Sequence, residues 1–502
     1  MEQGGERRSI SGIRGTAETL PCAKVARYCQ AYATLLRELS LGNTIVVGRD
    51  TRATSSDYAD AAIEAMNRCG WDVIDLGVVP TPTVQIAIAK FAAAGGIAIT
   101  ASHNPREYNG IKCLQNRLGH GMFLDKELVT RMFDVYDSGA FDERRHGERR
   151  PVSDFAAEFD APPYTAEFLD RNRIGTPVDN HVILDYHLAR VVEAMGRELD
   201  VIRGMDFHVA LDPCAGAGIP IDFVLLDLLY CNVRRVNDVP GRFMRPIEPS
   251  PANLEKLCKE LEDSPQPLDV AFVTDTDNDR CVLVAFDRAS GKYRPLAEDY
   301  TIAIAVDQVL SASPPGSTVV TNWSTSQALY DITRSHHAIL RRVPTGEVYT
   351  AGEALHCGAA IAGEGSCAGV IDPRVGMGRD VLAAMWHVLG SLAQKERSLD
   401  KLVSELPRYH QVSRDHPNAL GPDENRRLLD DLQAFYATKN NILLISREDG
   451  LVVCFDDRSR VQIRASNTEP LLRVRVEAPA RGRAEALAEE ALGAADPGGK
   501  GR

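Results

Sequence analysis

Three features are missing from this sequence of 502 residues: a long apolar run, paired cysteines and an excess of positive charge. No apolar run reaches the roughly 18 residues that a membrane-spanning helix needs. The polar start, residues 1–15, also lacks the apolar stretch of a secretory signal. We therefore expect a cytoplasmic protein that does not contact a membrane.

The cysteines and the charge exclude further classes. The 11 cysteines are an odd number, scattered from Cys22 to Cys454 without a Cys-x-x-Cys pair, so neither a disulfide framework nor a zinc site is indicated. The net charge of -13 disfavours broad binding to nucleic acid, which we do not expect as a partner. If the ligand is an anion, the cationic residues that bind it must be concentrated in a few places.

Strand-like and helical patterns alternate along most of the chain. Repeated βαβ units are predicted in residues 21–100, 183–274 and 317–395, and such repeats form mixed or mostly parallel sheets covered by helices. Residues 425–495 differ, because a helix, several strands and a second helix follow one another, as in an α+β domain. The polar, arginine-rich residues 138–163 predict an irregular linker or surface excursion.

These patterns predict three α/β domains followed by one α+β domain. We place them at residues 1–160, 161–295, 296–403 and 404–496, with a tail at 497–502. Four domains slightly exceed the roughly three that the length suggests at about 150 residues per domain.

The first chemical motif follows an apolar strand. Residues 96–100 lead into Ala101-Ser102-His103-Asn104-Pro105, at the carboxyl end of the strand, where open α/β sheets bind ligands. Most Ser-x-Asn-Pro strings are only turns. A serine here could carry a phosphoryl group if a base, cations and a metal lay nearby, and Lys112 is a candidate for the first two.

The second motif is Asp275-Thr276-Asp277-Asn278-Asp279-Arg280, directly after another apolar strand. Three carboxylates at alternate positions can converge on one hard cation such as Mg²⁺. An EF-hand is excluded, because its sixth loop position would be Arg280 instead of glycine and its twelfth Phe286 instead of glutamate. A solvated acidic loop is the alternative, but crowded carboxylates at a buried strand end need neutralisation.

The third motif lies near the C-terminus, at Arg464-Ala465-Ser466-Asn467-Thr468-Glu469-Pro470, with Arg473 beyond it. Its guanidinium, hydroxyl and amide groups could surround a phosphate dianion together with backbone N–H groups. An ordinary capped turn is the alternative. Two smaller loops, Thr345-Gly346-Glu347 and Gly363-Glu364-Gly365-Ser366, offer acceptors suited to sugar hydroxyls, although glutamates without such a role remain possible there.

Arginines also lie in two glycine-bounded loops, residues 11–15 and 48–52. Their side chains could either be solvated at the surface or contact a phosphate.

The combination of motifs carries more information than any one of them. A strand-end serine, a metal loop, acceptor loops and a separate phosphate cradle lie in different blocks, so a cleft between the blocks is the natural meeting place. Two sites for phosphate with sugar acceptors between them suggest transfer of a phosphoryl group from one end of a sugar to the other.

In these motifs, and in their order, the chain resembles the α-D-phosphohexomutase superfamily from Ser11 to about Glu490. Residues 100–105 resemble its phosphoserine loop, 275–280 its magnesium loop, 363–366 its sugar-recognition loop and 464–470 its phosphate-binding loop. The resemblance implies four domains around a central cleft. It also implies an intramolecular phosphotransferase that converts hexose or hexosamine 6-phosphates and 1-phosphates through a 1,6-bisphosphate, which also serves as activator.

The resemblance assigns roles to particular residues. The catalytic residues would be Ser102, Arg14, Lys112 and His103, with Arg280 beside them. One Mg²⁺ would be bound by Ser102, Asp275, Asp277 and Asp279. The substrate would contact Arg280, Thr345, Gly346, Glu347, Glu364 and Ser366. Its non-reacting phosphate would contact Arg464, Ser466, Asn467, Thr468 and Arg473.

Two departures from the family pattern stand out. The sugar loop reads Ser366-Cys367-Ala368, so a histidine that some members have is absent and Cys367 replaces a usual glycine. In the metal loop, Thr276 and Asn278 replace the usual glycine and alanine, but both lie between the ligands. The run from Gly363 to Pro373 resembles archaeal phosphoglucosamine mutases more than animal phosphoglucomutases.

Three hypotheses follow. The first is a Mg²⁺-dependent mutase acting on glucosamine, mannose or glucose phosphates as its small-molecule partners. The second is a binding protein that kept the fold and lost the chemistry, as the altered loop at 366–368 suggests. The third is a phosphatase that transfers the phosphoryl group to water. The oligomeric state and the preferred sugar stay open.

Overall fold

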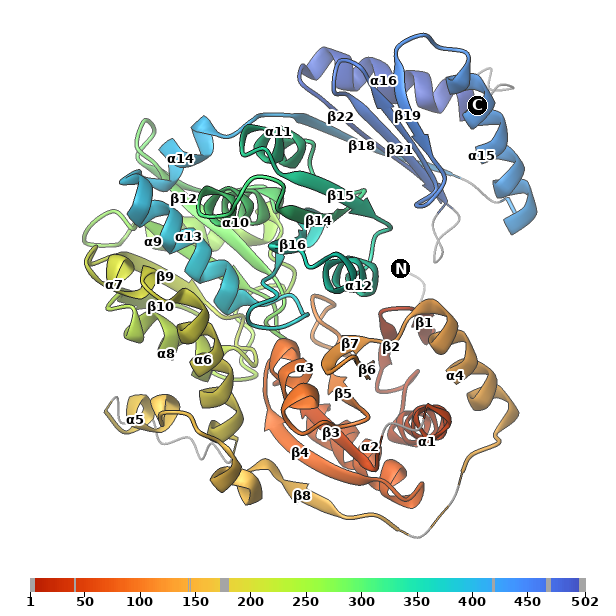
Figure 1. The fold of residues 1–502 in the computed structure, drawn as a ribbon, viewed down its shortest axis with the longest axis vertical. Helices are drawn as coiled ribbons and strands as arrows, with labels where there is room; N and C mark the ends of the chain where they lie inside the picture. Colours follow the sequence, from red (N-terminus) through yellow and green to blue (C-terminus); the bar gives the residue numbers. More distant parts are fainter. Residues whose placement is uncertain are drawn as a thin grey trace.

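The computed structural model describes residues 5–39, 42–142, 144, 146–171, 180–417, 420–465 and 471–495. In this part of the chain the strands form four sheets, each within one of the four predicted domain ranges (Figure 1). The exact boundaries stay a prediction. The predicted tail at 497–502 lies outside the described residues. None of the described helices combines the length and the apolar character needed to cross a lipid bilayer.

The first sheet is mixed. Its strands are β1 (Arg7–Ser9), β2 (Gly12–Thr16), β3 (Thr44–Arg49), β4 (Asp72–Val78), β5 (Gly95–Ile99), β6 (Tyr108–Arg117), β7 (His120–Phe123) and β8 (Arg149–Pro151). They lie in the order β1-β2-β6-β5-β3-β4-β8, with β7 beside β6. Strands β5, β3, β4 and β8 are parallel, whereas β1, β2 and β6 are antiparallel to their neighbours.

Helices cover both faces of this sheet. They are α1 (Cys22–Glu38), α2 (Ser55–Arg68), α3 (Thr81–Lys90), α4 (Lys126–Ser138) and the short 3₁₀ helix η1 (Val152–Glu158). Side chains of β3 alternate between the two faces: Ile45 and Val47 pack with α1 and α2, whereas Val46 packs with α3. This alternation of buried residues is why the strand reads as a continuous apolar run in the sequence.

The prediction of an irregular linker at 138–163 is wrong in one part. Residues Arg149–Pro151 form β8, which pairs with β4 and extends the first sheet, and η1 follows directly. A strand of three exposed residues has no detectable hydrophobic period, so the polar composition hid it.

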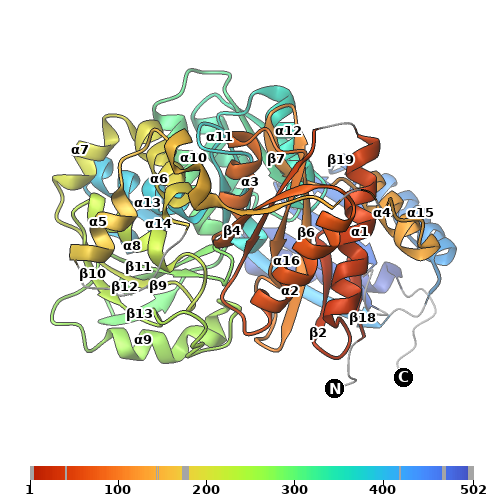
Figure 2. The same cartoon turned by 90° about the horizontal axis from the view of Figure 1, so that it is seen from below.

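The second sheet contains β9 (His208–Asp212), β10 (Asn232–Arg235), β11 (Val270–Thr274), β12 (Cys281–Asp287) and β13 (Lys292–Pro295), in the order β10-β9-β11-β12-β13. Strands β10, β9 and β11 are parallel, and β12 and β13 return antiparallel. Its helices are α5 (Tyr164–Arg171), α6 (His181–Met195), α7 (Glu198–Arg203), α8 (Ile219–Leu228), η2 (Pro251–Leu254) and α9 (Glu255–Leu261). Helix α6 packs beside α3 at the junction with the first sheet (Figure 2).

The third sheet contains β14 (Thr318–Asn322), β15 (Ile339–Val343), β16 (Ile361–Glu364) and β17 (Gly369–Ile371), in the order β15-β14-β16-β17. Its helices are α10 (Asp299–Ser311), α11 (Ala328–Ser335), α12 (Glu347–Cys357), η3 (Gly365–Cys367), α13 (Val381–Lys395) and α14 (Leu399–Glu405). Three strands are parallel and β17 is antiparallel. The first three predicted α/β blocks are thus confirmed as α/β with mixed sheets.

The fourth sheet is entirely antiparallel. Its strands are β18 (His410–Pro417), β19 (Ile442–Ser446), β20 (Leu451–Phe455), β21 (Arg460–Ala465) and β22 (Leu471–Ala478), in the order β18-β22-β21-β20-β19. Helices α15 (Pro422–Ala437) and α16 (Arg481–Ala495) pack on it. The predicted α+β class is confirmed for this block, the blue part of Figure 1.

The hydrophobic cores divide the molecule in the same way. One continuous apolar cluster runs through the first three sheets, from Val46 of β3 to Leu406 after α14. The fourth sheet has a separate cluster, whose fully buried members lie between Leu429 and Ala491. The first three blocks therefore form one packed body, and the fourth carries its own core.

Candidate active site

Ser102 lies in a turn that leaves the carboxyl end of β5. It has a φ of 50°, in the left-handed region that residues other than glycine rarely adopt. Its N–H donates to the Thr100 hydroxyl at 2.9 Å. Its carbonyl accepts from the Arg52 guanidinium at 2.5 Å and from the Thr276 hydroxyl at 2.9 Å. These bonds hold an unfavourable backbone conformation and thereby direct the serine side chain.

Arg52 is the main support of this turn. Its guanidinium donates to the carboxylate of Asp50 at 3.0 Å and to four carbonyls, those of Ser102, Asn104, Pro105 and Tyr108. The side chain is fully buried. Solvation and phosphate contact, the two roles that the sequence left open for Arg52, are both excluded in this structure, because all its donors are used within the protein.

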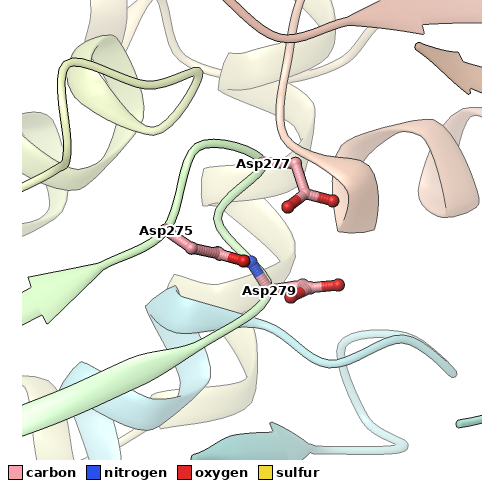
Figure 3. Close-up of side chains that lie close together, drawn as sticks. All are labelled: Asp275, Asp277 and Asp279. Carbon is pink, nitrogen blue, oxygen red and sulfur yellow. The ribbon is translucent and has the colours of Figure 1, made fainter. Parts of the chain in front are cut away.

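The three aspartates of the metal loop converge, as Figure 3 shows. The loop joins β11 to β12, and one carboxylate oxygen each from Asp275, Asp277 and Asp279 lies within 4.8 Å of the others. All three side chains are buried. Asp277 Oδ1 and Asp279 Oδ1 have no hydrogen-bond partner, which is costly for buried carboxylate oxygens.

The electrostatics of this cluster favour a bound cation. Burial, together with the neighbouring charges of Asp277 and Asp279, raises the pKa of Asp275 to about 8. A divalent ion would coordinate the two oxygens that lack a partner. It would also stabilise the ionised form of Asp275. An oxygen-only donor set fits Mg²⁺ or Ca²⁺ better than zinc. The residues present therefore fit the predicted Mg²⁺.

The serine turn and the metal loop meet. The Ser102 hydroxyl donates to Asp275 Oδ2 at 2.7 Å, although the two residues lie 173 positions apart in the sequence. Thr276 adds the bond to the Ser102 carbonyl. The threonine that departs from the family pattern thus joins the two loops, and the asparagine at 278 donates to Asp222 Oδ1 at 2.8 Å.

Cations surround the three carboxylates. Lys112 on β6 donates to Asp277 at 2.5 Å and to Asp279 at 2.9 Å. The Arg280 Nε lies 3.7 Å from Asp275. Although burial opposes it, the neighbouring cations Arg379, Lys112 and Arg280 lower the pKa of Asp279. The protein itself thus supplies much of the charge that the acidic cluster requires.

Arg379, which the sequence analysis missed, links the metal loop to the sugar loops. It lies just before α13 and is buried. Its guanidinium bonds to Asp279 at 2.7 Å, to Glu347 at 2.8 Å and to Glu364 at 3.4 Å. A lone arginine in the run Gly-Met-Gly-Arg-Asp carries no local signal for such a role, since its partners lie elsewhere in the chain.

A cavity of ≈ 210 Å³ lies in front of Ser102. It is bounded by loops of the first, second and third sheets. Among its lining residues are the predicted Arg14, Ser102, Lys112, Arg280, Thr345, Gly346, Glu347, Glu364 and Ser366. The structure therefore brings most of the predicted catalytic and substrate residues to one cavity.

The two glutamates of the cavity are held by the protein. Glu347 accepts from Arg379 and from Gln85, and burial raises the pKa of Glu347 to about 7. Glu364 accepts from Asn322 at 2.7 Å and from the Gly346 N–H at 2.9 Å. Both carboxylates are therefore fixed in orientation before any ligand arrives.

Cys367, the bulkier residue in the sugar loop, is accommodated. Its side chain is buried, and its Sγ lies 2.7 Å from Arg379 Nη1 and 3.7 Å from Glu364 Oε2. Burial raises the pKa of the Cys367 thiol to about 12, so the group is neutral. The thiol therefore belongs to the wall of the cavity.

Within the described residues, two predicted catalytic residues, Arg14 and His103, make no hydrogen bond to the Ser102 side chain or to the three aspartates. Arg14 lines the cavity and donates to Asn104 Oδ1 at 2.8 Å. His103 is adjacent to Ser102 in the chain but is not among the residues that line the cavity. Burial, with the charges of Arg280 and Arg14, lowers the pKa of His103 to about 2, so the imidazole is neutral at physiological pH.

Two of the predicted phosphate residues, Arg464 and Arg473, lie at a second, adjoining cavity of ≈ 110 Å³. Arg464 of β21 and Arg473 of β22 are directly paired across the sheet and both line it. Thr345 and Ser366 line both cavities, so the two adjoin. Ser466, Asn467 and Thr468 lie outside the described residues. Arg475, which the sequence analysis did not single out, lines the second cavity as well.

Comparisons with known proteins give the same family over most of the chain. Family models described as "Phosphoglucomutase/phosphomannomutase, alpha/beta/alpha domain I", "alpha/beta/alpha domain III" and "C-terminal domain" match residues 7–139, 297–409 and 418–494. A "Phosphoglucomutase/phosphomannomutase" of Thermococcus kodakarensis is 32% identical, over 95% of this chain and 96% of that protein. A Methanopyrus kandleri protein named "Probable phosphoglucosamine mutase" is 30% identical over 97% of each chain.

Solved structures share the fold. A phosphoglucomutase/phosphomannomutase family protein from Burkholderia thailandensis superposes with a TM-score of 0.75 at 22% identity, covering 98% of this chain and 99% of that chain. An Aspergillus fumigatus N-acetylphosphoglucosamine mutase, solved in complex with GlcNAc-6P and magnesium, has a TM-score of 0.58 at 17% identity and covers 98% and 96%. At these identities the likeness concerns the fold.

Proposed function

The chain belongs to the α-D-phosphohexomutase superfamily, and we propose that it moves a phosphoryl group between the two ends of a hexose or hexosamine phosphate by way of Ser102. Its relatives are named as mutases, and the chain is an enzyme of this class. One observation carries the proposal. The Ser102 hydroxyl lies 2.7 Å from Asp275, in the same cavity as the predicted sugar-binding residues.

In the proposed reaction, phosphoserine 102 faces a free hydroxyl of hexose 1- or 6-phosphate. The bond between phosphorus and Ser102 Oγ breaks, a bond to the sugar oxygen forms, and the hydroxyl proton passes to a neighbouring base. The product is a sugar 1,6-bisphosphate. The bisphosphate turns within the site, and its other phosphoryl group moves to Ser102: the bond from phosphorus to the sugar oxygen breaks, the bond to Ser102 Oγ forms, and the serine proton passes to the freed sugar oxygen, which regenerates the phosphoserine.

The residues of the cavity support this chemistry. Although burial opposes it, Asp277 and Asp279 raise the pKa of Lys112, so its ammonium stays charged and can stabilise the transferring group. Asp275, Asp277, Asp279 and an oxygen on Ser102 would hold a Mg²⁺ ion, which supplies positive charge beside the phosphoryl group. Glu347 and Glu364 are oriented to accept sugar hydroxyls.

The arginine cavity would hold the phosphate that does not react. Arg464 and Arg473 line it, and solved relatives were determined in complex with sugar phosphates, namely GlcNAc-6P and glucose 1,6-bisphosphate. Glucosamine, mannose and glucose phosphates are the proposed substrates, in a cytoplasmic setting. A Thermococcus kodakarensis relative at 28% identity is named phosphopentomutase, so pentose phosphates belong among the compounds to be assayed.

The test is a coupled isomerisation assay. The purified chain, with Mg²⁺ and a trace of glucose 1,6-bisphosphate, is given the 1-phosphates of glucose, mannose, glucosamine and ribose in turn. We expect isomerisation of at least one hexose phosphate and its complete loss in Ser102→Ala. Full activity of Ser102→Ala would contradict the phosphoserine step. Binding without isomerisation would favour a non-catalytic homologue, and phosphate release that exceeds isomerisation would favour a phosphatase.

A further inference from the structure

Arg475 lies on the face of the fourth sheet that is turned away from its own core. Along β22, Leu472, Val474 and Val476 are buried in the hydrophobic cluster beneath α15 and α16. Successive side chains of a strand point to opposite faces, so residues 473, 475 and 477 share the other face. That face borders both the arginine cavity and a larger one of ≈ 360 Å³.

Two arginines on this face, Arg460 and Arg464, are paired with acidic residues, whereas in the described part of the chain Arg475 is not. Arg464 bonds to Asp449 at 3.0 Å, and Arg460 bonds to Glu477 at 3.0 Å. Arg475 is opposite Gln462 on one side and Ser413 on the other, both uncharged. Within the described residues, Arg475 makes no hydrogen bond and no ion pair.

The environment of Arg475 is instead crowded with like charge. Arg464 and Arg473 line the same small cavity, and burial together with these two guanidiniums lowers the pKa of Arg475, although Glu298 and Asp299 on the side of the larger cavity act in the opposite direction. Arg464 and Arg473 are directly opposite each other on β21 and β22, and like charges in such a pair destabilise a sheet. Among the described residues, the others that line this cavity are the uncharged Ser324, Thr345, Ser366 and Gln462.

The size of the cavity suits a small oxyanion group. At ≈ 110 Å³ the cavity has room for several water molecules, and therefore for a small oxyanion. Three guanidiniums around such a space offer forked donors, the geometry that matches phosphate oxygens. The larger cavity beside it contains Glu298, Asp299 and Glu477, which disfavour an anion there.

We propose that Arg475 is a third arginine for the substrate's non-transferred phosphate, and that it retains the bisphosphate while the sugar turns. This rests on the proposed mutase function. The ligand class is a phosphomonoester dianion. The position lies outside the Arg464–Pro470 motif, so the sequence pattern gives no hint of it. Its contribution comes on top of the two arginines that the motif does predict.

The first experiment measures steady-state kinetics of Arg475→Met against the wild type. We expect KM for the hexose phosphate to rise about tenfold to a hundredfold, as for a lost charge-assisted hydrogen bond, with kcat little changed at saturation. Inhibition by inorganic phosphate weakens in parallel. Arg475→Lys, which keeps the charge without the fork, restores part of the loss. Arg481→Met, on the exposed side of α16, is the matched control and leaves KM unchanged.

The second experiment measures how often the intermediate escapes. Labelled hexose 1,6-bisphosphate released per turnover, and the concentration of added bisphosphate needed for half-maximal activity, both increase in Arg475→Met and stay at wild-type values in Arg481→Met. A purely structural role would move neither. Since Arg475 has no partner to lose, the midpoint of thermal unfolding stays at or above that of the wild type.

Two results separate this inference from the proposed function. If the wild type isomerises a hexose phosphate while Arg475→Met has unchanged KM, phosphate inhibition and bisphosphate release, Arg475 does not bind the phosphate and the inference is overturned. If the wild type isomerises none of the sugar phosphates, the proposed function itself fails. In that case calorimetric titration with inorganic phosphate decides the role of Arg475, since weaker binding by Arg475→Met supports a phosphate site and equal binding overturns it.

Discussion

The two ends of the site are built in opposite ways. Around Ser102 the charges are buried and bonded to one another: the Lys112 side chain is 4% exposed and contacts two aspartates. At the arginine cavity the side chains are open to solvent, with Arg464 at 38% exposure and Arg475 without a partner among the described residues. In the proposed mechanism the protein thus organises the reacting end in advance, and the ligand completes the other end.

This difference has an energetic basis. A buried charge is tolerated only when it is paired, and removing one partner leaves the other uncompensated. An exposed charge remains hydrated, so its removal has little effect on folding. Substitutions at the reacting end should therefore affect both activity and stability, whereas substitutions at the arginine end should affect ligand binding alone.

The largest expected effect is that of removing the metal. Chelation by EDTA should lower isomerisation at least about a thousandfold, because a cation beside a transferring group contributes several kcal/mol. Adding Mg²⁺ back restores activity in the wild type but not in Asp277→Asn. Calorimetric binding of hexose phosphate at the arginine end persists in EDTA. Full turnover without divalent ions would contradict the role proposed for a metal beside Ser102.

Next in size is the replacement of Arg379. Arg379→Met removes the shared partner of Asp279, Glu347 and Glu364 and should lower the free energy of unfolding by about 3–5 kcal/mol. Urea denaturation followed by circular dichroism measures this change. Arg464→Met, the matched substitution at the exposed end, should cost less than about 1 kcal/mol. Equal losses in the two variants would contradict the contrast between the ends.

A smaller effect is expected at Thr276. Thr276→Val keeps the shape of the side chain and removes its bond to the Ser102 carbonyl, which Arg52 still contacts. One hydrogen bond of about 0.5–1.5 kcal/mol corresponds to a fall in kcat of roughly threefold to tenfold. Thr276→Ser retains the hydroxyl and should keep most of the rate. If Thr276→Val turns over like the wild type, the two loops do not depend on this bond.

The last prediction concerns stability alone, at Glu298 in the larger cavity beside Arg475. Burial raises the pKa of Glu298 from its ordinary value of 4.5 to about 7. The folded state therefore binds this proton more tightly, so the group's contribution to stability is complete below pH 4.5 and is lost as the pH rises through about 7. Glu298→Gln should remove this loss. The stability difference between variant and wild type should grow by about 1–2 kcal/mol between pH 4.5 and 7.5 in urea titrations. If the stability difference between variant and wild type does not change with pH, the pKa of Glu298 is not raised in the folded protein and this prediction is wrong.

The sequence predicted the reacting residues better than the strands that carry them. Ser102 and the three aspartates each follow a short apolar run, at the strand end where α/β sheets bind ligands. The two strands belong to different sheets, so their meeting could be expected only at a cleft between the blocks. Lys112 was predicted as a functional residue, yet β6, its strand, was not recognised, because its polar and apolar residues do not alternate clearly.

The residues that were missed act through distant contacts. Arg379 lies 100 positions from Asp279, and nothing in its own neighbourhood indicates that partner. Thr276 was noticed as a departure, but its bond to Ser102 depends on how two sheets are placed. Arg475 lies two positions after Arg473, and only the strand's alternation shows that both face one cavity.

The separate core of the fourth sheet has a mechanical consequence. Its contacts with the third block include polar ones, among them Trp323 with Glu448, Thr345 with Asp449, and the backbone N–H of Gln327 with Glu477. Water can replace each of these bonds, and pulling the two blocks apart leaves the apolar interior of both intact. We therefore expect the fourth block, with its arginine wall, to move apart from the rest more easily than the three blocks that share one core.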